Sequence, residues 1–182
     1  MAFIALAIVV GLVAGVLAGG RVTNLGRVPL RGWPLLLAGA GTQAVAAAAS
    51  GQLAFGLVVA SYALLVAFAG ANLAVAGMGL VLIGIVLNLV PIAANASMPV
   101  RESAVVAAGL ADWREVATLG FTGKRHLERP GDRFTLLGDI IPFAAAREVL
   151  SFGDVVLSFG AGAVVANMAR RRRRVMGAGA GT

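Results

Sequence analysis

The residues of this chain that could take part in chemistry are concentrated in one stretch, residues 120–156. Lys124, Arg125 and His126 are adjacent there, and His126 is the only histidine of the sequence. Asp139 and Asp154 each follow a glycine and precede two aliphatic residues. Clustered basic side chains bind phosphate, and carboxylates at a membrane surface bind a cation or a polar headgroup. A site in this protein is therefore expected in this stretch.

Each of these features also has a purely structural explanation. An aspartate ahead of an aliphatic run caps a helix, because its side chain accepts hydrogen bonds from the first free N–H groups. On this interpretation Asp139 and Asp154 begin helices. A single histidine in a charged loop is typical of a solvated surface, so His126 is expected to be exposed. Lys124, Arg125 and His126 would then belong to a loop that contacts lipid headgroups.

Several classes of chemistry are disfavoured by what the sequence lacks. The absence of cysteine excludes disulfides, thiolate metal sites and thiol catalysis. The chemistry of lipid phosphatases needs a histidine nucleophile with further partners, and the basic residues before Arg129 and Pro130 have the wrong spacing for it. We therefore expect no catalytic residues, no cofactor and no metal, and a protein that is not an enzyme.

The composition predicts that lipid is the solvent of this protein. Of its 182 residues 59% are hydrophobic and 13% are charged, and the mean hydropathy is +0.92. Soluble domains contain roughly 45–50% apolar and about 25% charged residues. A chain of this length could not bury so much apolar surface in a soluble fold.

The apolar segments predict a single all-α, polytopic membrane domain with about five transmembrane helices. The predicted spans cover residues 2–20, 34–49, 52–70, 76–95 and 151–170. Gly11, Gly15 and Gly19 form a ridge that permits close helix packing. Asn88 and Asn95 fall on one face of the fourth span. Interhelical hydrogen bonding explains a buried amide such as Asn88, and a translocation path is the alternative.

Residues 97–148 differ in kind from the spans. Seven basic and seven acidic side chains lie between Met98 and Glu148, so the segment has no net charge. Residues 102–119 show helical periodicity with charges on one side, which predicts a surface helix. Residues 134–146 are apolar but too short to cross, so they are expected to be re-entrant or interfacial.

The distribution of positive charge predicts the orientation. The loop of residues 21–31 holds three arginines and no acid, and residues 170–174 are five consecutive arginines. Positive residues near the spans stay in the cytoplasm. We therefore expect the N-terminus and residues 97–148 outside, and the basic tail 170–182 in the cytoplasm. No aromatic or basic module accompanies the arginine run, so nucleic acid is not an expected partner.

Four short motifs in order carry a family resemblance: residues 95–100 (NASMPV), 124–126 (KRH), 137–142 (LGDIIP) and 151–157 (SFGDVVL). They resemble a family of small multi-pass bacterial membrane proteins, mainly actinobacterial and clostridial, known only as a domain of unknown function. The resemblance implies a location in the bacterial plasma membrane and no particular chemistry. The family's marked positions would be Asn95, Met98, Pro99, Lys124, His126, Gly138, Asp139, Pro142, Gly153 and Asp154.

The expected role is a non-catalytic membrane component that interacts with lipid or binds a partner. Its partners would be membrane lipids and, as an open alternative, other membrane subunits. A second hypothesis is a small transporter or channel-like protein that uses Asp139, Asp154 and Asn88. A third is a membrane enzyme that acts on a phospholipid-like substrate at Lys124, Arg125, His126 and Asp139.

Overall fold

Helices make up 67% of the residues that the structure describes. The structure, a computed structural model, describes residues 2–118, 121 and 124–170. The long helices of this described part are α1 (Ala2–Leu17), α2 (Trp33–Ala48), α3 (Gly51–Ala71), α4 (Met78–Asn95) and α6 (Phe152–Arg170). They begin and end within a few residues of the predicted apolar segments. The predicted basic tail beyond Arg170 lies outside the described residues.

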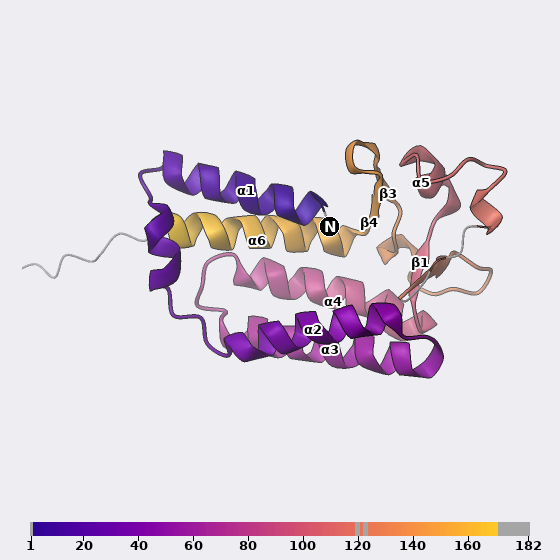
Figure 1. The fold of residues 1–182 in the computed structure, drawn as a ribbon, viewed down its shortest axis with the longest axis horizontal. Coiled ribbons are helices and arrows are strands. Elements are labelled where there is room, and N and C mark those ends of the chain that lie inside the picture. Colours follow the sequence, from indigo (N-terminus) through magenta and orange to yellow (C-terminus); the bar gives the residue numbers. More distant parts are fainter. Residues whose placement is uncertain (1, 119–120, 122–123, 171–182) are drawn as a thin grey trace, which may run out of the picture.

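The long helices lie side by side, and each runs opposite to the one before it in the chain, so that α1 and α6 are parallel neighbours (Figure 1). In space they follow the order α1, α6, α4, α3, α2, because α6 packs between α1 and α4, and α3 packs between α4 and α2. The connection from α1 to α2 contains a 3₁₀ helix, η1 (Val22–Arg27), which packs on α6. The N-terminus of α1 therefore lies at the same end of the bundle as the beginning of α6.

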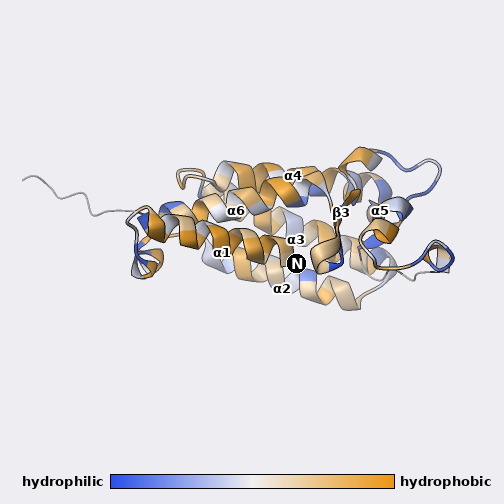
Figure 2. Ribbon diagram, turned by 90° about the horizontal axis from the view of Figure 1, so that it is seen from above, coloured by the Kyte–Doolittle hydropathy of each residue, from blue (hydrophilic) through white to orange (hydrophobic). Residues whose placement is uncertain are grey.

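Three helices of the described chain, α3, α4 and α6, are long and apolar enough to cross a membrane. Apolar residues dominate all the long helices, while polar residues gather in the segments at both ends (Figure 2). Helices α1 and α2 have 16 residues each, which is about 24 Å at 1.5 Å per residue. That length is below the roughly 30 Å of a bilayer's hydrocarbon core.

Glycines let α6 approach both of its neighbours closely. A Cβ at Gly11 or Gly15 would collide with the backbone of Gly162 or Ala166 in α6, so these two glycines form the predicted packing ridge. A Cβ at Gly84 of α4 would lie 2.5 Å from the backbone nitrogen of Leu157. Gly19, the third member of the predicted ridge, lies beyond the end of α1 with φ +83°.

The chain between α4 and α6 folds into a cap on one end of the bundle. It consists of short elements rather than the predicted surface helix over 102–119, and it adds two small sheets to the predicted all-α fold. Its first half contains β1 (Met98–Val100), α5 (Glu102–Ala107), η2 (Val116–Thr118) and β2 (Arg125–Leu127). Its second half contains η3 (Thr135–Leu137), β3 (Ile141–Phe143), η4 (Ala144–Ala146) and β4 (Glu148–Leu150).

The helix break inside 102–119 has a local cause. Gly109 adopts φ +70°, a left-handed conformation that ends the run begun by α5. The apolar residues that suggested one long helix, Val105 and Val116, instead meet in a small core of the cap with Val100 and Val149. Periodicity alone could not distinguish a long amphipathic helix from two turns that fold onto one core.

No helix follows Asp139, contrary to the prediction that this residue caps one. Residues 139–150 form the antiparallel hairpin of β3 and β4, in which Pro142 pairs with Val149. The apolar stretch 134–146 is accordingly two short 3₁₀ turns and one strand, and not a re-entrant helix. Pro142 is compatible with the observed strand as well as with the predicted helix, because proline tolerates the edge of a sheet as well as the first turn of a helix.

Specific contacts fix the cap to the bundle. Asn95, at the end of α4, exchanges two hydrogen bonds of 2.8 Å with the backbone of Arg133. The backbone N–H of Ala2 donates to Glu148 Oε1 at 2.8 Å. The rings of Phe3 and Phe143 pack edge to face at 5.4 Å. Cap and bundle thus share polar and apolar contacts on two sides.

Candidate functional site

Strand β1 is the element around which the site is built. It pairs in parallel with β2, so that Met98 faces Arg125 and Pro99 faces His126. On its other edge the backbone of Asp139 bonds to Pro99 and Arg101, at 2.9 and 3.0 Å. One short strand directly after α4 therefore brings the basic segment 124–126 and Asp139 together from positions far apart in the chain.

Ser97, His126 and Asp132 form a continuous hydrogen-bonded row beside this strand. Ser97 Oγ lies 2.6 Å from His126 Nδ1, and His126 Nε2 lies 2.9 Å from Asp132 Oδ2. The imidazole is 8% exposed, so the predicted surface histidine is buried. Burial raises the pKa of the Asp132 carboxyl, but the Arg129 N–H and His126 outweigh this, and its pKa lies below the ordinary value.

The position of Asp132 follows from a tight turn over residues 129–132. Pro130 and Gly131 occupy its centre, Gly131 has φ +100°, and the Asp132 N–H donates to Arg129 O at 3.1 Å. These are the features of a type II turn, which needs a positive φ at its third residue. The backbone N–H of Arg129 in turn donates to Asp132 Oδ2 at 2.8 Å. The turn holds the carboxylate against the imidazole.

An open cavity of about 390 Å³ adjoins this row of side chains. Its wall includes Ser97 and His126 together with the guanidinium-bearing residues Arg125 and Arg129. Glu128 also lines it but is paired with Arg101 at 3.0 Å. Phe121 and Leu127 supply the apolar part of the wall. The cavity therefore offers hydrogen-bonding groups, positive charge and apolar surface to a ligand.

Asp139 is buried against Arg125, one of the residues that line the cavity. Arg125 Nε lies 2.8 Å from Asp139 Oδ2, and the Asp139 side chain is 1% exposed. The contact is an ion pair too oblique for a directed hydrogen bond, and Oδ2 accepts none from the residues that the structure describes. Burial raises the pKa of Asp139 to about 7, against the opposing effect of Arg125. Asp139 can therefore exchange a proton near neutral pH.

Lys124 points into the protein rather than toward lipid headgroups. Its Nζ donates to Gln43 Oε1 of α2 at 3.3 Å. Burial, and then the charge of Arg125, lower the pKa of Lys124 below its ordinary value, while Asp154 and Asp139 oppose this. Of the three adjacent basic residues, Arg125 and His126 face the cavity and Lys124 joins the cap to α2.

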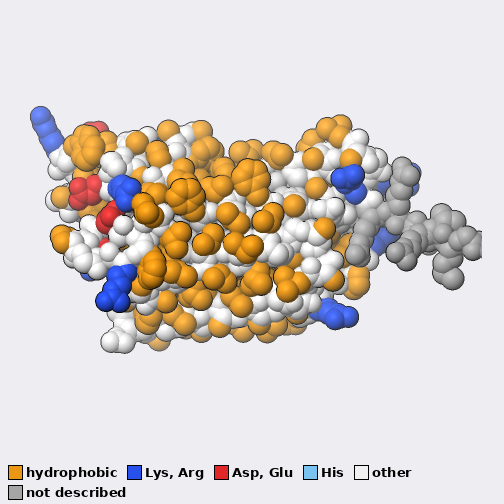
Figure 3. Space-filling view, turned by 180° about the vertical axis from the view of Figure 1, so that it is seen from behind, with side chains coloured by type: hydrophobic (Ala, Val, Ile, Leu, Met, Phe, Trp, Pro, Cys, Tyr) orange, Lys and Arg blue, Asp and Glu red, His pale blue; other side chains and the backbone are white. Residues whose placement is uncertain are grey.

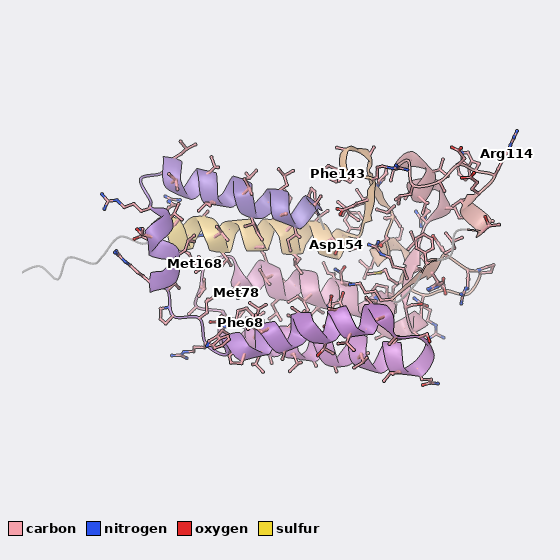
Figure 4. All side chains as sticks on the ribbon, viewed as in Figure 1. Phe68, Met78, Arg114, Phe143, Asp154 and Met168 are labelled. Atoms are coloured by element: carbon pink, nitrogen blue, oxygen red, sulfur yellow. The ribbon has the colours of Figure 1, made fainter. Side chains whose placement is uncertain are left out.

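Asp154 lies in the first turn of α6 at the cap end of the bundle (Figure 4). Its Oδ1 accepts a bond of 2.8 Å from Asn88 Nδ2 of α4, and its Oδ2 accepts one of 3.1 Å from the Ser151 N–H. Ser151 Oγ accepts from the Asp154 N–H at 2.9 Å and donates to Asn88 Oδ1 at 2.6 Å. Ser151 and Asp154 form a capping box, which Asn88 closes from the neighbouring helix.

Gly153 makes room for this arrangement, because a Cβ there would coincide with the side chain of Asn88. The amide of Asn88 thus lies directly against the first turn of α6. The structure confirms that Asn88 makes interhelical hydrogen bonds. Asn95, the other predicted polar residue of α4, contacts Pro91 and Arg133 and belongs to the joint between α4 and the cap.

Two residues of the row, Ser97 and Asp132, are absent from the predicted set of site residues. Nothing in the sequence marks the pairing of Ser97 with His126, since it depends on parallel strands 27 positions apart. Asp132 has a readable signal, the proline and glycine of a type II turn just after a basic strand. That turn reverses the chain and brings Asp132 back toward His126.

Comparison with known proteins identifies one family. Residues 28–166 match the model of a family described as "Family of unknown function (DUF5317)". The matched region extends from just before α2 to within α6, and so includes the complete cap. No curated protein and no solved structure matches the chain.

Proposed function

The chain belongs to this family of unknown function, DUF5317, and from that premise we propose that it is a membrane component that binds anionic lipid headgroups in the cavity of its cap. The cavity is the observation that carries the proposal. Arg129 and Arg125 line it and supply positive charge, although Arg125 is also paired with Asp139, and Ser97 of its wall lies two residues after the end of α4. Guanidinium groups bind phosphate oxygens with paired hydrogen bonds.

The surface of the bundle supports an integral membrane protein. Hydrophobic side chains cover the middle of the molecule, whereas lysine, arginine and acidic side chains lie toward its two ends (Figure 3). Large exposed apolar residues occur on every long helix, as with Val10, Leu37, Leu53, Ile83 and Phe159. Soluble proteins rarely expose apolar surface of this extent, and lipid contact explains it.

We propose five spans, with α1 and α2 included. Each runs from one end of the bundle to the other, and α1, α2 and α3 follow one another in opposite directions. Their shortness is compatible with crossing, because a bilayer thins locally around short helices and flanking arginines extend their side chains to the interface. Arg21 follows α1, Arg31 lies just before α2, and Trp33 is the first residue of α2.

The proposed orientation places the cap and the N-terminus outside the cytoplasm of a bacterial cell and the opposite end inside it. Arg21, Arg27 and Arg31 lie at the end away from the cap, where α6 also ends in Arg170. Positive residues beside the spans favour the cytoplasmic side. The cap would then meet the outer leaflet of the plasma membrane.

Single-cysteine labelling tests the orientation directly, because the chain has no cysteine of its own. Ser50→Cys lies in the turn between α2 and α3 at the cap end, and Thr23→Cys lies in η1 at the other end; both positions are exposed and uncharged. In intact cells a membrane-impermeant maleimide should label position 50 and spare position 23. The reverse pattern would overturn the orientation.

Lipid binding is tested with the purified protein in detergent, by native mass spectrometry after addition of phosphatidylglycerol or phosphatidylcholine. We expect retention of phosphatidylglycerol, and a loss of roughly 5- to 30-fold in affinity for Arg129→Gln, as for one charge-assisted contact of about 1–2 kcal/mol. Arg114→Gln is the matched control, since Arg114 is exposed at the tip of the cap (Figure 4). Equal binding of both lipids would contradict the proposal.

A small transporter is the second candidate, and one observation favours it. Asp139, Asp154 and Asn88 lie near one another at the cap end of α4 and α6, where the charges of Asp154 and Arg125 both act on Asp139. Two carboxylates beside a transmembrane amide are a common basis for proton or cation coupling. Reconstituted vesicles with an internal pH dye test this, since wild-type protein should then carry protons and Asp139→Asn should not.

A further inference from the structure

We propose that Ser97, His126 and Asp132 are the nucleophile, the general base and the positioning residue of an acyl-ester hydrolase site. The inference rests on the same cavity as the proposed lipid binding and adds a reaction to it. The alternative is that His126 is a buried histidine whose two nitrogens are merely satisfied by hydrogen bonds. Geometry, burial and the neighbouring cavity favour the reactive interpretation.

The hydrogen bonds fix the direction in which a proton moves. A carboxylate can only accept, so His126 Nε2 carries the hydrogen and donates it to Asp132 Oδ2 at 2.9 Å. Nδ1 is then bare and accepts the hydroxyl hydrogen of Ser97 at 2.6 Å. These are the roles in which a base activates a serine hydroxyl while a carboxylate holds the imidazole in the required tautomer, here with Nδ1 rather than Nε2 facing the serine.

The surroundings of Ser97 suit a reacting group better than a structural one. Ser97 is half-buried and lines the cavity, so its hydroxyl can meet a ligand. The preceding residue, Ala96, has φ +61°, a conformation unfavourable for any residue with a Cβ. Such backbone strain is concentrated at functional sites. It ends α4 abruptly and turns Ser97 toward His126 before β1 begins.

The neighbouring cavity indicates the class of substrate. Its wall combines Arg125 and Arg129 with Phe121 and Leu127. An ester with an acyl chain and a nearby anionic group fits this combination, and a glycerophospholipid has both. The same positive charge would stabilise the oxyanion that forms when a serine attacks an ester carbonyl.

The reaction balances with water as the only co-reactant. His126 Nδ1 takes the proton of Ser97 as Oγ attacks the carbonyl carbon, and that proton then passes to the alcohol oxygen as the carbon–oxygen bond breaks. An acyl ester of Ser97 remains. Water attacks this ester, gives a proton to His126, and releases a carboxylic acid while the proton returns to Ser97. The net change is ester plus water to acid plus alcohol.

A fluorophosphonate probe on the full-length protein in detergent tests the site. We expect one covalent adduct at Ser97, found by peptide mass spectrometry, and none on heat-denatured protein. Ser97→Ala should abolish the adduct, and Ser103→Ala, in the exposed face of α5, should leave it unchanged. His126→Gln should slow labelling by roughly 100-fold or more, the usual effect of losing a general base. Labelling at the same rate without His126 would overturn the proposal.

Asp132 needs a test that separates positioning from folding. Asp132→Asn should slow labelling, and Asp132→Glu, which retains an acceptor, should restore part of the rate. If a variant does not fold, Ser97→Cys provides a second measurement, because the chain is otherwise free of cysteine. Its thiol should react with iodoacetamide at least about 10-fold faster than that of Ser103→Cys, as expected for a thiol beside an imidazole. Equal reactivity of the two thiols would contradict the proposal.

The two proposals can fail separately. Ser97→Ala should still bind phosphatidylglycerol, since it removes no charge from the cavity. Lipid binding without any adduct at Ser97 would leave the headgroup site and reject the hydrolase. An adduct at Ser97 without preference for anionic lipid would support the hydrolase site and reject the headgroup site. Hydrolysis of p-nitrophenyl butyrate by wild-type protein, and not by Ser97→Ala, would show turnover beyond a single labelling event.

Discussion

Asn88 Nδ2 and Asp154 Oδ1 lie 2.8 Å apart, and this bond joins α4 to the first turn of α6. The other carboxylate oxygen accepts from the Ser151 N–H at 3.1 Å. Both oxygens of Asp154 thus act as acceptors. The Asn88 amide cannot turn its oxygen toward Asp154, because Asn88 Oδ1 already accepts from Ser151 Oγ. A side chain that only capped the helix would need one acceptor oxygen, whereas Asp154 uses both of its oxygens as acceptors.

Asp154→Asn should therefore destabilise the protein, although asparagine has the same shape as aspartate and retains one acceptor oxygen. The introduced amide has one oxygen for two donors, so its NH2 group faces either Asn88 Nδ2 or the Ser151 N–H and one bond is left unmade, at about 1–3 kcal/mol. Thermal unfolding in detergent measures the effect. Asp112→Asn, at an exposed position of the cap, is the control and should leave the melting temperature unchanged. Equal melting temperatures for both variants would show that the protein does not need both carboxylate oxygens of Asp154 as acceptors.

The ionisation of Asp139 should make the folded state less stable as pH rises toward neutrality. Burial raises the pKa of Asp139 from 3.8 to about 7, so between these pH values the folded state holds a proton that the unfolded chain has lost. The free energy of unfolding then falls with increasing pH, by at most about 1.4 kcal/mol per pH unit. Above pH 7 this contribution is constant.

Comparison with Asp139→Asn isolates this contribution, because Asp132 and Glu148 have lowered pKa values and act in the opposite direction in acid. The difference in melting temperature between the variant and wild type should change steadily from pH 4.5 to 7 in favour of the variant. It should then level off. A difference that is independent of pH would show that Asp139 remains ionised throughout.

Close packing of α4 on α6 should make Gly84 intolerant of substitution. A Cβ at Gly84 would lie 2.5 Å from Leu157 N and 2.6 Å from Leu157 Cβ, so the helices must separate to admit it. Gly84→Ala should lower stability by about 1–3 kcal/mol, as overpacking does. Gly56→Ala in α3 is the matched control, since nothing lies within 4 Å of a Cβ there. It should be neutral or stabilising by up to about 1 kcal/mol.

The bundle could be predicted from the sequence because each of its helices is a local feature. Length and hydropathy mark α3, α4 and α6, and the spacing of Gly11 and Gly15 marks the ridge against α6. The cap could not be predicted in this way. Its organising strand, β1, has three residues, and its partners His126 and Asp139 lie far along the chain.

The difference between local features and long-range pairing also explains which site residues the sequence could predict. Their adjacent basic side chains indicate Lys124, Arg125 and His126 as candidates. The glycine and aliphatic neighbours of Asp139 and Asp154 indicate these two residues. Ser97 has no such signal, since one serine after a helix is unremarkable until a distant strand places an imidazole beside it. Asp139 ahead of an aliphatic run predicted a helix start. The preceding glycine has another role, since a Cβ at Gly138 would lie 2.5 Å from Pro99 O, and so Gly138 permits close approach to β1.

Asn95 should hold the loop around Arg133 against the end of α4. It exchanges two hydrogen bonds of 2.8 Å with the Arg133 backbone, in addition to one of 2.9 Å to Pro91 O. Asn95→Ala should speed amide hydrogen exchange over residues 128–137 by about 10-fold or more, since each bond contributes on the order of 1 kcal/mol. The remaining helices should exchange as in the wild type.

Asn167→Ala provides the control for Asn95→Ala. Asn167 makes the same type of bond to the carbonyl four residues earlier, Ala163 O at 2.8 Å, but it lies in the last turn of α6, at the end away from the cap. Exchange over 128–137 should be unaffected by it. Because Asp132 lies in this loop, Asn95→Ala should also slow fluorophosphonate labelling of Ser97, whereas Asn167→Ala should not. Unchanged exchange in Asn95→Ala would show that the turn at Pro130 and Gly131 alone positions Asp132.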